Sequence, residues 1–151
     1  MDWLFSFNTN DSKNDEGNMK TIAESNRLIA DFMGWKINYE NPNIDTTMKH
    51  HTEWNWLMPV VEKIEDLDLS EWMYKWEDLE DGMRYNFEGI SIEIQNKRCW
   101  IYINLALDPM RTINEKTFNK EYNSKIEATY AAVVEFIEWY NERKKREENE
   151  G

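Results

Sequence analysis

The chain is short of the residues on which several kinds of functional site depend. Its 151 residues include one cysteine, two histidines, five glycines and three prolines. The single Cys99 excludes an intramolecular disulfide and cysteine-based zinc sites, and it favours a reducing cytoplasm. No apolar run reaches the ~18–20 residues that span a bilayer, and the Asp-, Asn- and Ser-rich start is unlike a signal peptide. We therefore expect a cytoplasmic protein with no membrane partner.

Basic residues are also scarce. The chain has 18 Lys and Arg against 30 Asp and Glu, a net charge of −12, which argues against direct nucleic-acid binding. Residues 1–82 carry a net −11, residues 83–125 carry +2 and residues 126–151 carry −3. An anionic ligand is therefore expected near the middle segment. The plain alternative is that an acidic surface keeps a small protein in solution.

The length suits one domain, and the 14% of aromatic residues predict a core built on Trp, Tyr and Phe. We expect a flexible N-terminal segment over 1–17, which holds the apolar stretch Trp3–Phe7. A single α+β domain over 18–141 and a charged, frayed tail over 142–151 follow.

Apolar spacing predicts four helices. The first covers about 19–33 and ends at Gly34. The second begins near Trp56 after an Asn55 cap, which leaves Pro59 near its first turn. A short helix is expected within 65–81, and the last helix follows a capping box from Ser124 to Glu127. A short strand is expected at 35–39, and polar loops at 40–48 and 108–123.

A β-hairpin is the best-specified element. Ile90, Ile92 and Ile94 alternate with polar residues, and Asn96-Lys97 makes a two-residue turn. Folding about this turn opposes Ile94 to Cys99, Ile92 to Ile101 and Ile90 to Ile103, which makes one face wholly apolar. Together these elements predict an α+β fold, in which helices pack on a small, mainly antiparallel sheet with a central hairpin in an α/β/α sandwich.

Three blocks of the sequence resemble a known group. They are 22–24 with 32–36, the stretch His51–Ile64, and 124–128 with 133–137. These blocks are similar to small phage-encoded proteins close to the phage ABA-sandwich domain, and the likeness covers about 19–141. The region 65–87 looks longer here. The resemblance implies an α/β/α sandwich made in a bacterial cytoplasm, and it transfers no catalytic residue.

Few residues point to catalysis. His50 and His51 are adjacent, and on an extended segment they point to opposite sides, so they make a poor metal pair. Cys99 falls on the apolar hairpin face, where a thiol is inert. Glu88 and Glu93 form a carboxylate pair only if a pocket separates their pKa values. We expect no enzyme, metal or cofactor, with a small hydrolase as the weakest alternative.

The segment after the hairpin is the best candidate for a ligand site. It carries three cations and leads into the start of the last helix, where free N–H groups favour anions. Nearby aromatic rings could stack on a nucleobase. The candidate ligand-binding residues are His51, Trp54, Trp56, Tyr102, Arg111, Lys116 and Lys120. The alternative is a solvated loop beside core tryptophans.

Two functions remain open. The first is a non-enzymatic phage accessory protein, in a counter-defence role, that captures a small anionic and aromatic ligand such as a nucleotide signal. The second is an acidic inhibitor that binds a host enzyme or defence protein, with nucleic-acid mimicry as one route. Homo-oligomers are compatible with both, because many apolar side chains compete for one small surface.

Overall fold

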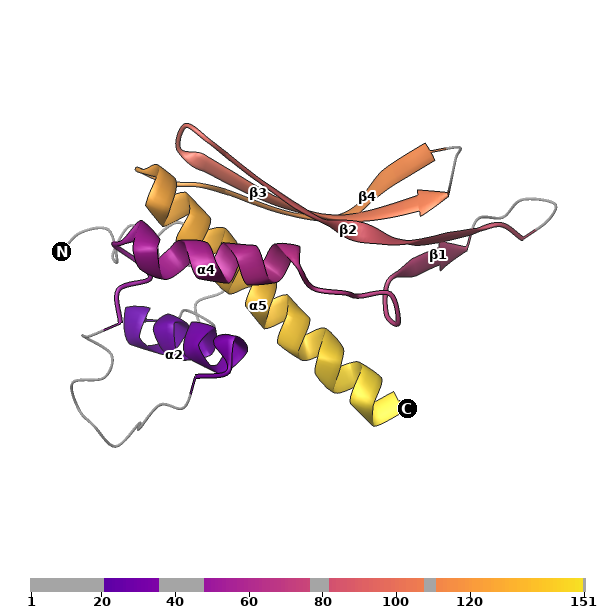
Figure 1. Ribbon diagram of the computed structural model, residues 1–151, viewed down its shortest axis with the longest axis horizontal. Coiled ribbons are helices and arrows are strands. Elements are labelled where there is room, and N and C mark those ends of the chain that lie inside the picture. Colours follow the sequence, from indigo (N-terminus) through magenta and orange to yellow (C-terminus); the bar gives the residue numbers. More distant parts are fainter. Residues whose placement is uncertain (1–20, 36–47, 77–81, 108–110, 151) are drawn as a thin grey trace.

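The computed structural model describes residues 21–35, 48–76, 82–107 and 111–150. Its elements are α2 (Ile22–Met33), α4 (Trp54–Glu65), β1 (Tyr74–Trp76), β2 (Arg84–Gln95), β3 (Arg98–Leu107), β4 (Arg111–Glu121) and α5 (Lys125–Glu150). The strands form one antiparallel sheet in the order β1-β2-β3-β4. The described helices lie on one side of this sheet (Figure 1). The α+β class, with a central hairpin in an antiparallel sheet packed by helices, is confirmed.

The hairpin has the register that the sequence predicts. Ile94 pairs with Cys99, Ile92 with Ile101, and Ile90 with Ile103. Asn96 has a φ of 55°, which supplies the positive φ that a two-residue hairpin turn requires. Cys99, Ile101 and Ile103 are fully buried beneath the helices. Burying each isoleucine contributes roughly 2 kcal/mol, so a one-residue slip would cost several times that amount.

The loop predicted over 108–123 is wrong. β4 pairs with β3 along its length, from Leu107 opposite Arg111 to Arg98 opposite Glu121. Of this strand only Phe118 is buried, and most other side chains are exposed. An edge strand with so little burial shows no apolar alternation, so the sequence pattern resembles a loop. Residues 108–110 of the predicted loop lie outside the described part of the chain.

The helix predicted within 65–81 is also wrong for the residues that the structure describes. Leu69 to Met73 form a turn, in which the Leu69 carbonyl accepts from the N–H groups of Trp72 and Met73. The chain then extends as β1, which pairs with residues 84–86 of β2. The apolar residues of this segment have helical spacing, but pairing with the later strand β2 keeps residues 74–76 extended.

The sheet is strongly curled. β1 and β4 are opposite edges, and a flat sheet would separate them by about 14 Å. Nevertheless Lys75 Nζ of β1 lies 3.8 Å from Glu115 Oε2 of β4. The two edges therefore curl towards each other over the face that the helices cover. α5 crosses the rest of this face diagonally (Figure 1).

The helices before the sheet have well-defined ends. Thr21 and Glu24 form a capping box at the start of α2. Gly34 ends this helix with a φ of 77°, as the sequence predicts. α4 begins at Trp54 rather than Trp56, and its N-cap is Glu53, so the Asn55 cap is wrong. Pro59 therefore lies inside the helix, where it removes one backbone hydrogen bond. The four buried side chains of α4 offset this loss: Leu57, Val60, Val61 and Ile64.

The last helix starts as predicted and ends later. The Ser124 hydroxyl accepts from the Glu127 N–H at 3.3 Å and donates to its carboxylate at 2.9 Å. The helix continues through Glu150, so residues 142–150, expected to fray, are helical. Arg143 anchors this part because it donates to the Trp72 carbonyl at 2.7 Å and pairs with Glu147. Among the described helices, none is long and apolar enough to cross a membrane.

Candidate functional site

The turn before α4 holds a buried histidine between two tryptophans. His50 is fully buried, and its ring centroid lies 5.3 Å from that of Trp35 and 5.1 Å from that of Trp56. Neither ring nitrogen of His50 has a hydrogen-bond partner among the described residues. Burial, with a smaller effect of neighbouring His51, lowers the pKa of His50 to about 4. This imidazole is therefore neutral near pH 7 and packs as an aromatic ring.

His51 belongs to a different, polar cluster. The side-chain amide nitrogen of Asn26 donates to the Met48 carbonyl at 3.2 Å and lies 3.3 Å from His51 Nδ1. The Tyr130 hydroxyl donates to Asn26 Oδ1 at 2.9 Å. Because an amide nitrogen only donates, the contact makes Nδ1 the acceptor and places the ring proton on Nε2. Burial lowers the pKa of His51, which agrees with this neutral form.

This polar cluster joins three separate elements. Asn26 lies on α2, His51 on the turn and Tyr130 on α5, and both Asn26 and Tyr130 are fully buried. Each hydrogen bond in such a network contributes about 1 kcal/mol, and an unpaired buried member costs more. The cluster thus fixes the entrance of α4 against the other two helices. It commits His51, one of the predicted ligand residues, to a structural contact.

The described part of the chain holds neither a reactive thiol nor a cluster of metal ligands. Burial raises the pKa of the Cys99 thiol to about 11, so almost no thiolate forms near pH 7. This agrees with the apolar position predicted for it. No group of three or more His, Cys, Asp and Glu side chains could hold a metal ion among the residues described.

The three predicted cations lie on β4, spread along its length. Arg111 and Lys120 are nine residues apart, which is about 30 Å on an extended strand. The Arg111 guanidinium lies 5.4 Å from the ring centroid of Tyr85, and Lys116 Nζ lies 5.3 Å from that of Phe118. Lys120 pairs with Glu135 of α5 at 2.5 Å. One small ligand cannot contact both ends of this row.

The predicted aromatic residues are also separated. Tyr102 pairs with Thr117 and points to the opposite face of the sheet from its buried neighbours Ile101 and Ile103. On α4, Trp56 faces α2 through Trp35, whose ring centroid lies 6.0 Å away. Trp54 is about 200° away from Trp56 on the helical wheel and is 37% exposed. The structure therefore does not assemble the predicted nucleotide site.

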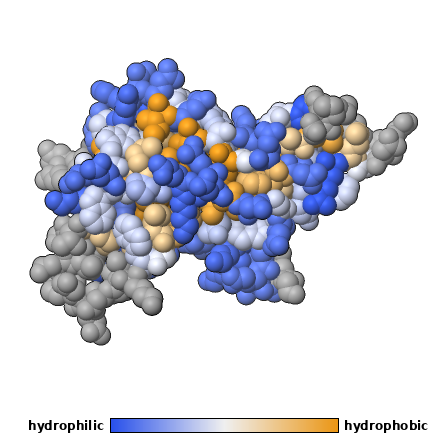
Figure 2. Space-filling view, in the orientation of Figure 1, coloured by the Kyte–Doolittle hydropathy of each residue, from blue (hydrophilic) through white to orange (hydrophobic). Residues whose placement is uncertain are grey.

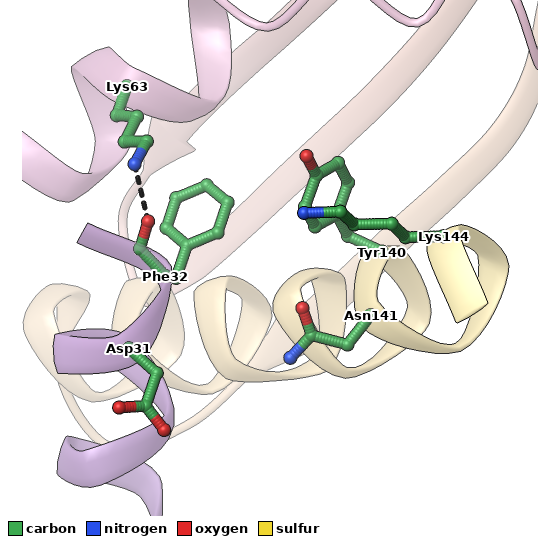
Figure 3. A pocket seen from close by; sticks show the side chains of 6 residues that line it. All are labelled: Asp31, Phe32, Lys63, Tyr140, Asn141 and Lys144. Atoms are coloured by element: carbon green, nitrogen blue, oxygen red, sulfur yellow. Dashed lines mark hydrogen bonds between the residues drawn. The ribbon is translucent and has the colours of Figure 1, made fainter. Parts of the chain in front are cut away.

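A small polar pocket lies where α2, α4 and α5 meet (Figure 3). Its volume is about 200 Å³, and its lining residues are Asp31, Phe32, Lys63, Tyr140, Asn141 and Lys144. Lys63 donates to the Phe32 carbonyl, and its Nζ lies 4.8 Å from the Phe32 ring centroid. A lysine at this place stabilises the carboxyl end of α2. The sequence carries no signal for this pocket, because its residues come from three distant segments.

The most distinctive surface lies between α4 and β2. β1 pairs only with residues 84–86, so among the described residues no strand pairs with this side of β2 from Phe87 to Gln95. α4 lies along this free edge (Figure 1). Trp54 and Met58, 37% and 36% exposed, lie on the flank of α4 opposite the one that meets α2. We call this surface, formed by the edge 87–95 and the α4 flank, the β2–α4 groove.

The β2–α4 groove is apolar at its base. Ile92 and Ile94 of β2 are half-buried and pack against the core. Figure 2 shows a band of hydrophobic residues between α4 and the sheet, with hydrophilic residues on both sides of it. Sequence reasoning predicted the hairpin and the helix but missed this surface, since it exists only where the two pack side by side.

Comparisons with protein-family models, curated proteins and solved structures find no match. The resemblance to the phage ABA-sandwich domain therefore stays a prediction.

Proposed function

We propose that the protein is a non-enzymatic binding protein that accepts an extended segment of a partner protein on the free edge of β2. The observation that carries this proposal is the unpaired stretch 87–95 beside the exposed apolar flank of α4. Its nine residues span about 30 Å and present a row of backbone donors and acceptors. Adding a strand satisfies these groups, and the neighbouring apolar side chains provide the contact area.

The edge carries few of the features with which proteins block unwanted pairing. Exposed edges usually carry a proline or an inward-pointing charge. The stretch 87–95 contains no proline and no lysine, and its side chains towards the helices are apolar: Phe87, Ile90, Ile92 and Ile94. Its one irregularity is a register shift between Phe87 and Gly89. An unprotected edge of this kind is suited to pairing with an added strand.

The state of the reactive side chains supports a non-enzymatic role. Cys99 is buried with a raised pKa, His50 is neutral between two tryptophans, and His51 is held by Asn26. The small-ligand function depended on cations gathered in one loop, and β4 spreads these cations along a strand. The geometry thus supports the protein-binding alternative better. A host enzyme as target, and a counter-defence role, remain part of the proposal through the phage resemblance.

Site-specific photo-crosslinking tests the proposal. A photoreactive phenylalanine analogue at Met58 lies in the β2–α4 groove, and the same analogue at Trp76 lies on the exposed β1, away from the groove. We expect one protein partner to crosslink at Met58 and not at Trp76. Trp54→Ala should weaken this capture at least tenfold, while Trp76→Ala, which removes an equally large exposed ring, should leave it unchanged. Equal crosslinking at both positions would contradict the proposal.

A further inference from the structure

Exposed carboxylates surround the β2–α4 groove. On α4, Glu62 and Glu65 are exposed, and Glu65 follows Trp54 and Met58 on the same flank of the helix. On β2, Glu88 and Glu93 are exposed on the outer face of the sheet, where Glu88 accepts from the Thr112 hydroxyl of β4 at 3.4 Å. Carboxylates therefore flank the apolar base on the α4 side and on the outer face of the sheet.

The electrostatic environment of Glu65 agrees with this concentration of negative charge. Its pKa is raised by burial and by the neighbouring carboxylates of Asp66 and Glu62. A cation placed near these three groups would relieve their mutual repulsion. The groove therefore attracts a positively charged ligand.

Four of the nearby cations are engaged elsewhere. Lys63 of α4 points to α2, where it donates to the Phe32 carbonyl. Lys49 pairs with Glu53 at 3.5 Å, and Arg98 pairs with Glu121 at 3.1 Å. Arg84 lies over the rings of Tyr74 and Trp76, at 4.4 and 5.6 Å from their centroids. Hence these four cations do not neutralise the carboxylates around the groove, and a cationic partner can pair with them.

Strand geometry then determines the pattern of that partner. Successive side chains of an extended segment point to opposite faces, so alternate residues would meet the apolar base beside Ile92 and Ile94. The intervening residues would lie on the outer face of the sheet, which carries Glu93. Resting on the proposed function, we infer that the occupant is an extended protein segment in which apolar residues alternate with lysine or arginine.

A second copy of this chain fits the groove poorly. Pairing two β2 edges would bring Glu88 and Glu93 of one copy beside the same residues of the other. Like charges directly opposite each other on paired strands are destabilising, and each chain already carries a net charge of −12. We therefore expect a monomer, and sedimentation of the free protein as a dimer protected at residues 87–95 would overturn the inference.

The test uses two synthetic ten-residue peptides, one alternating valine with lysine and the other alternating valine with glutamate. Amide chemical shifts of the full chain locate binding, and Trp fluorescence gives the affinity. We expect only the lysine peptide to bind, with shifts at residues 87–95 and along Trp54, Met58 and Glu62. Its affinity should fall at least tenfold between about 0.05 and 0.5 M salt, because salt screens exposed charges.

Matched variants separate local charge from total charge. Combining Glu88→Gln with Glu93→Gln should weaken the lysine peptide about tenfold or more, whereas Glu142→Gln with Glu148→Gln, the same loss on the exposed end of α5, should change affinity less than twofold. If both peptides bind equally at residues 87–95, the charge inference fails and strand addition stands. If neither peptide shifts these amides, the proposed function fails as well.

Discussion

Replacing Asn26 by alanine should destabilise the whole domain, although Asn26 is not one of the predicted ligand-binding residues. Its buried side-chain amide bonds to the Met48 carbonyl, lies beside His51 Nδ1 and accepts from the Tyr130 hydroxyl. Three hydrogen bonds at about 1 kcal/mol each give a loss of roughly 3 kcal/mol, and unpaired buried partners add to it. In a domain of this size, 3 kcal/mol lowers the melting temperature by about 6–12 °C.

Urea unfolding provides the assay, with Asn119→Ala on exposed β4 as the control that should change stability by under about 0.5 kcal/mol. Asn26→Ala should shift the midpoint and leave the m-value unchanged. Tyr130→Phe removes one member of the same network. The double variant should therefore cost about 1 kcal/mol less than the sum of the single changes. A loss below about 1 kcal/mol for Asn26→Ala, or strict additivity, would refute the assignment of a coupled network.

Three further predictions concern single buried or strained positions. The folded pKa of His50, about 4, lies below its ordinary value of 6.5, so the unfolded chain binds the proton first. Stability should be full above pH 6.5 and fall by roughly 3 kcal/mol towards pH 4, and urea unfolding of His50→Phe should lack this part of the loss. Cys99 should resist a thiol reagent at pH 8 until the chain unfolds, because it is buried and its pKa is raised; labelling at the rate of a free thiol would contradict its burial. Gly34→Ala should cost about 1 kcal/mol through its positive φ alone, since no atom lies within 4 Å of an added Cβ, and an unchanged melting temperature would contradict that conformation.

The parts of the fold that were predicted correctly have local causes. Alternating isoleucines and the Asn96 turn determine the hairpin register within fourteen residues of sequence. Gly34 marks the end of α2, and Ser124 marks the start of α5. Each of these signals depends on residues within one or two turns of chain, so no knowledge of the tertiary structure was needed.

The parts that were missed depend on partners distant in sequence. β1 is a strand because β2 returns to pair with it, and β4 is a strand because β3 does. β1 has only three residues, all of them exposed, and β4 buries only Phe118, so neither strand shows the alternating burial by which a sequence pattern is recognised. α5 continues past residue 141 because Arg143 reaches the Trp72 carbonyl, 71 residues away.

The predicted ligand site on β4 was wrong, and the β2–α4 groove was missed, for the same reason. Arg111, Lys116 and Lys120 would be neighbours in a compact loop, but the extended β4 separates them. Conversely, nothing in the sequence places α4 beside residues 87–95. The β2–α4 groove appears only when the short β1 leaves most of β2 unpaired.

The most direct test of strand addition is a measurement of cross-strand proton contacts in the complex with the valine–lysine peptide. We expect nuclear Overhauser contacts between backbone protons of the peptide and those of residues 87–95, repeated every second residue, with peptide side chains near Trp54 and Met58. A bound peptide without such contacts to β2 would contradict the central claim, whatever its affinity.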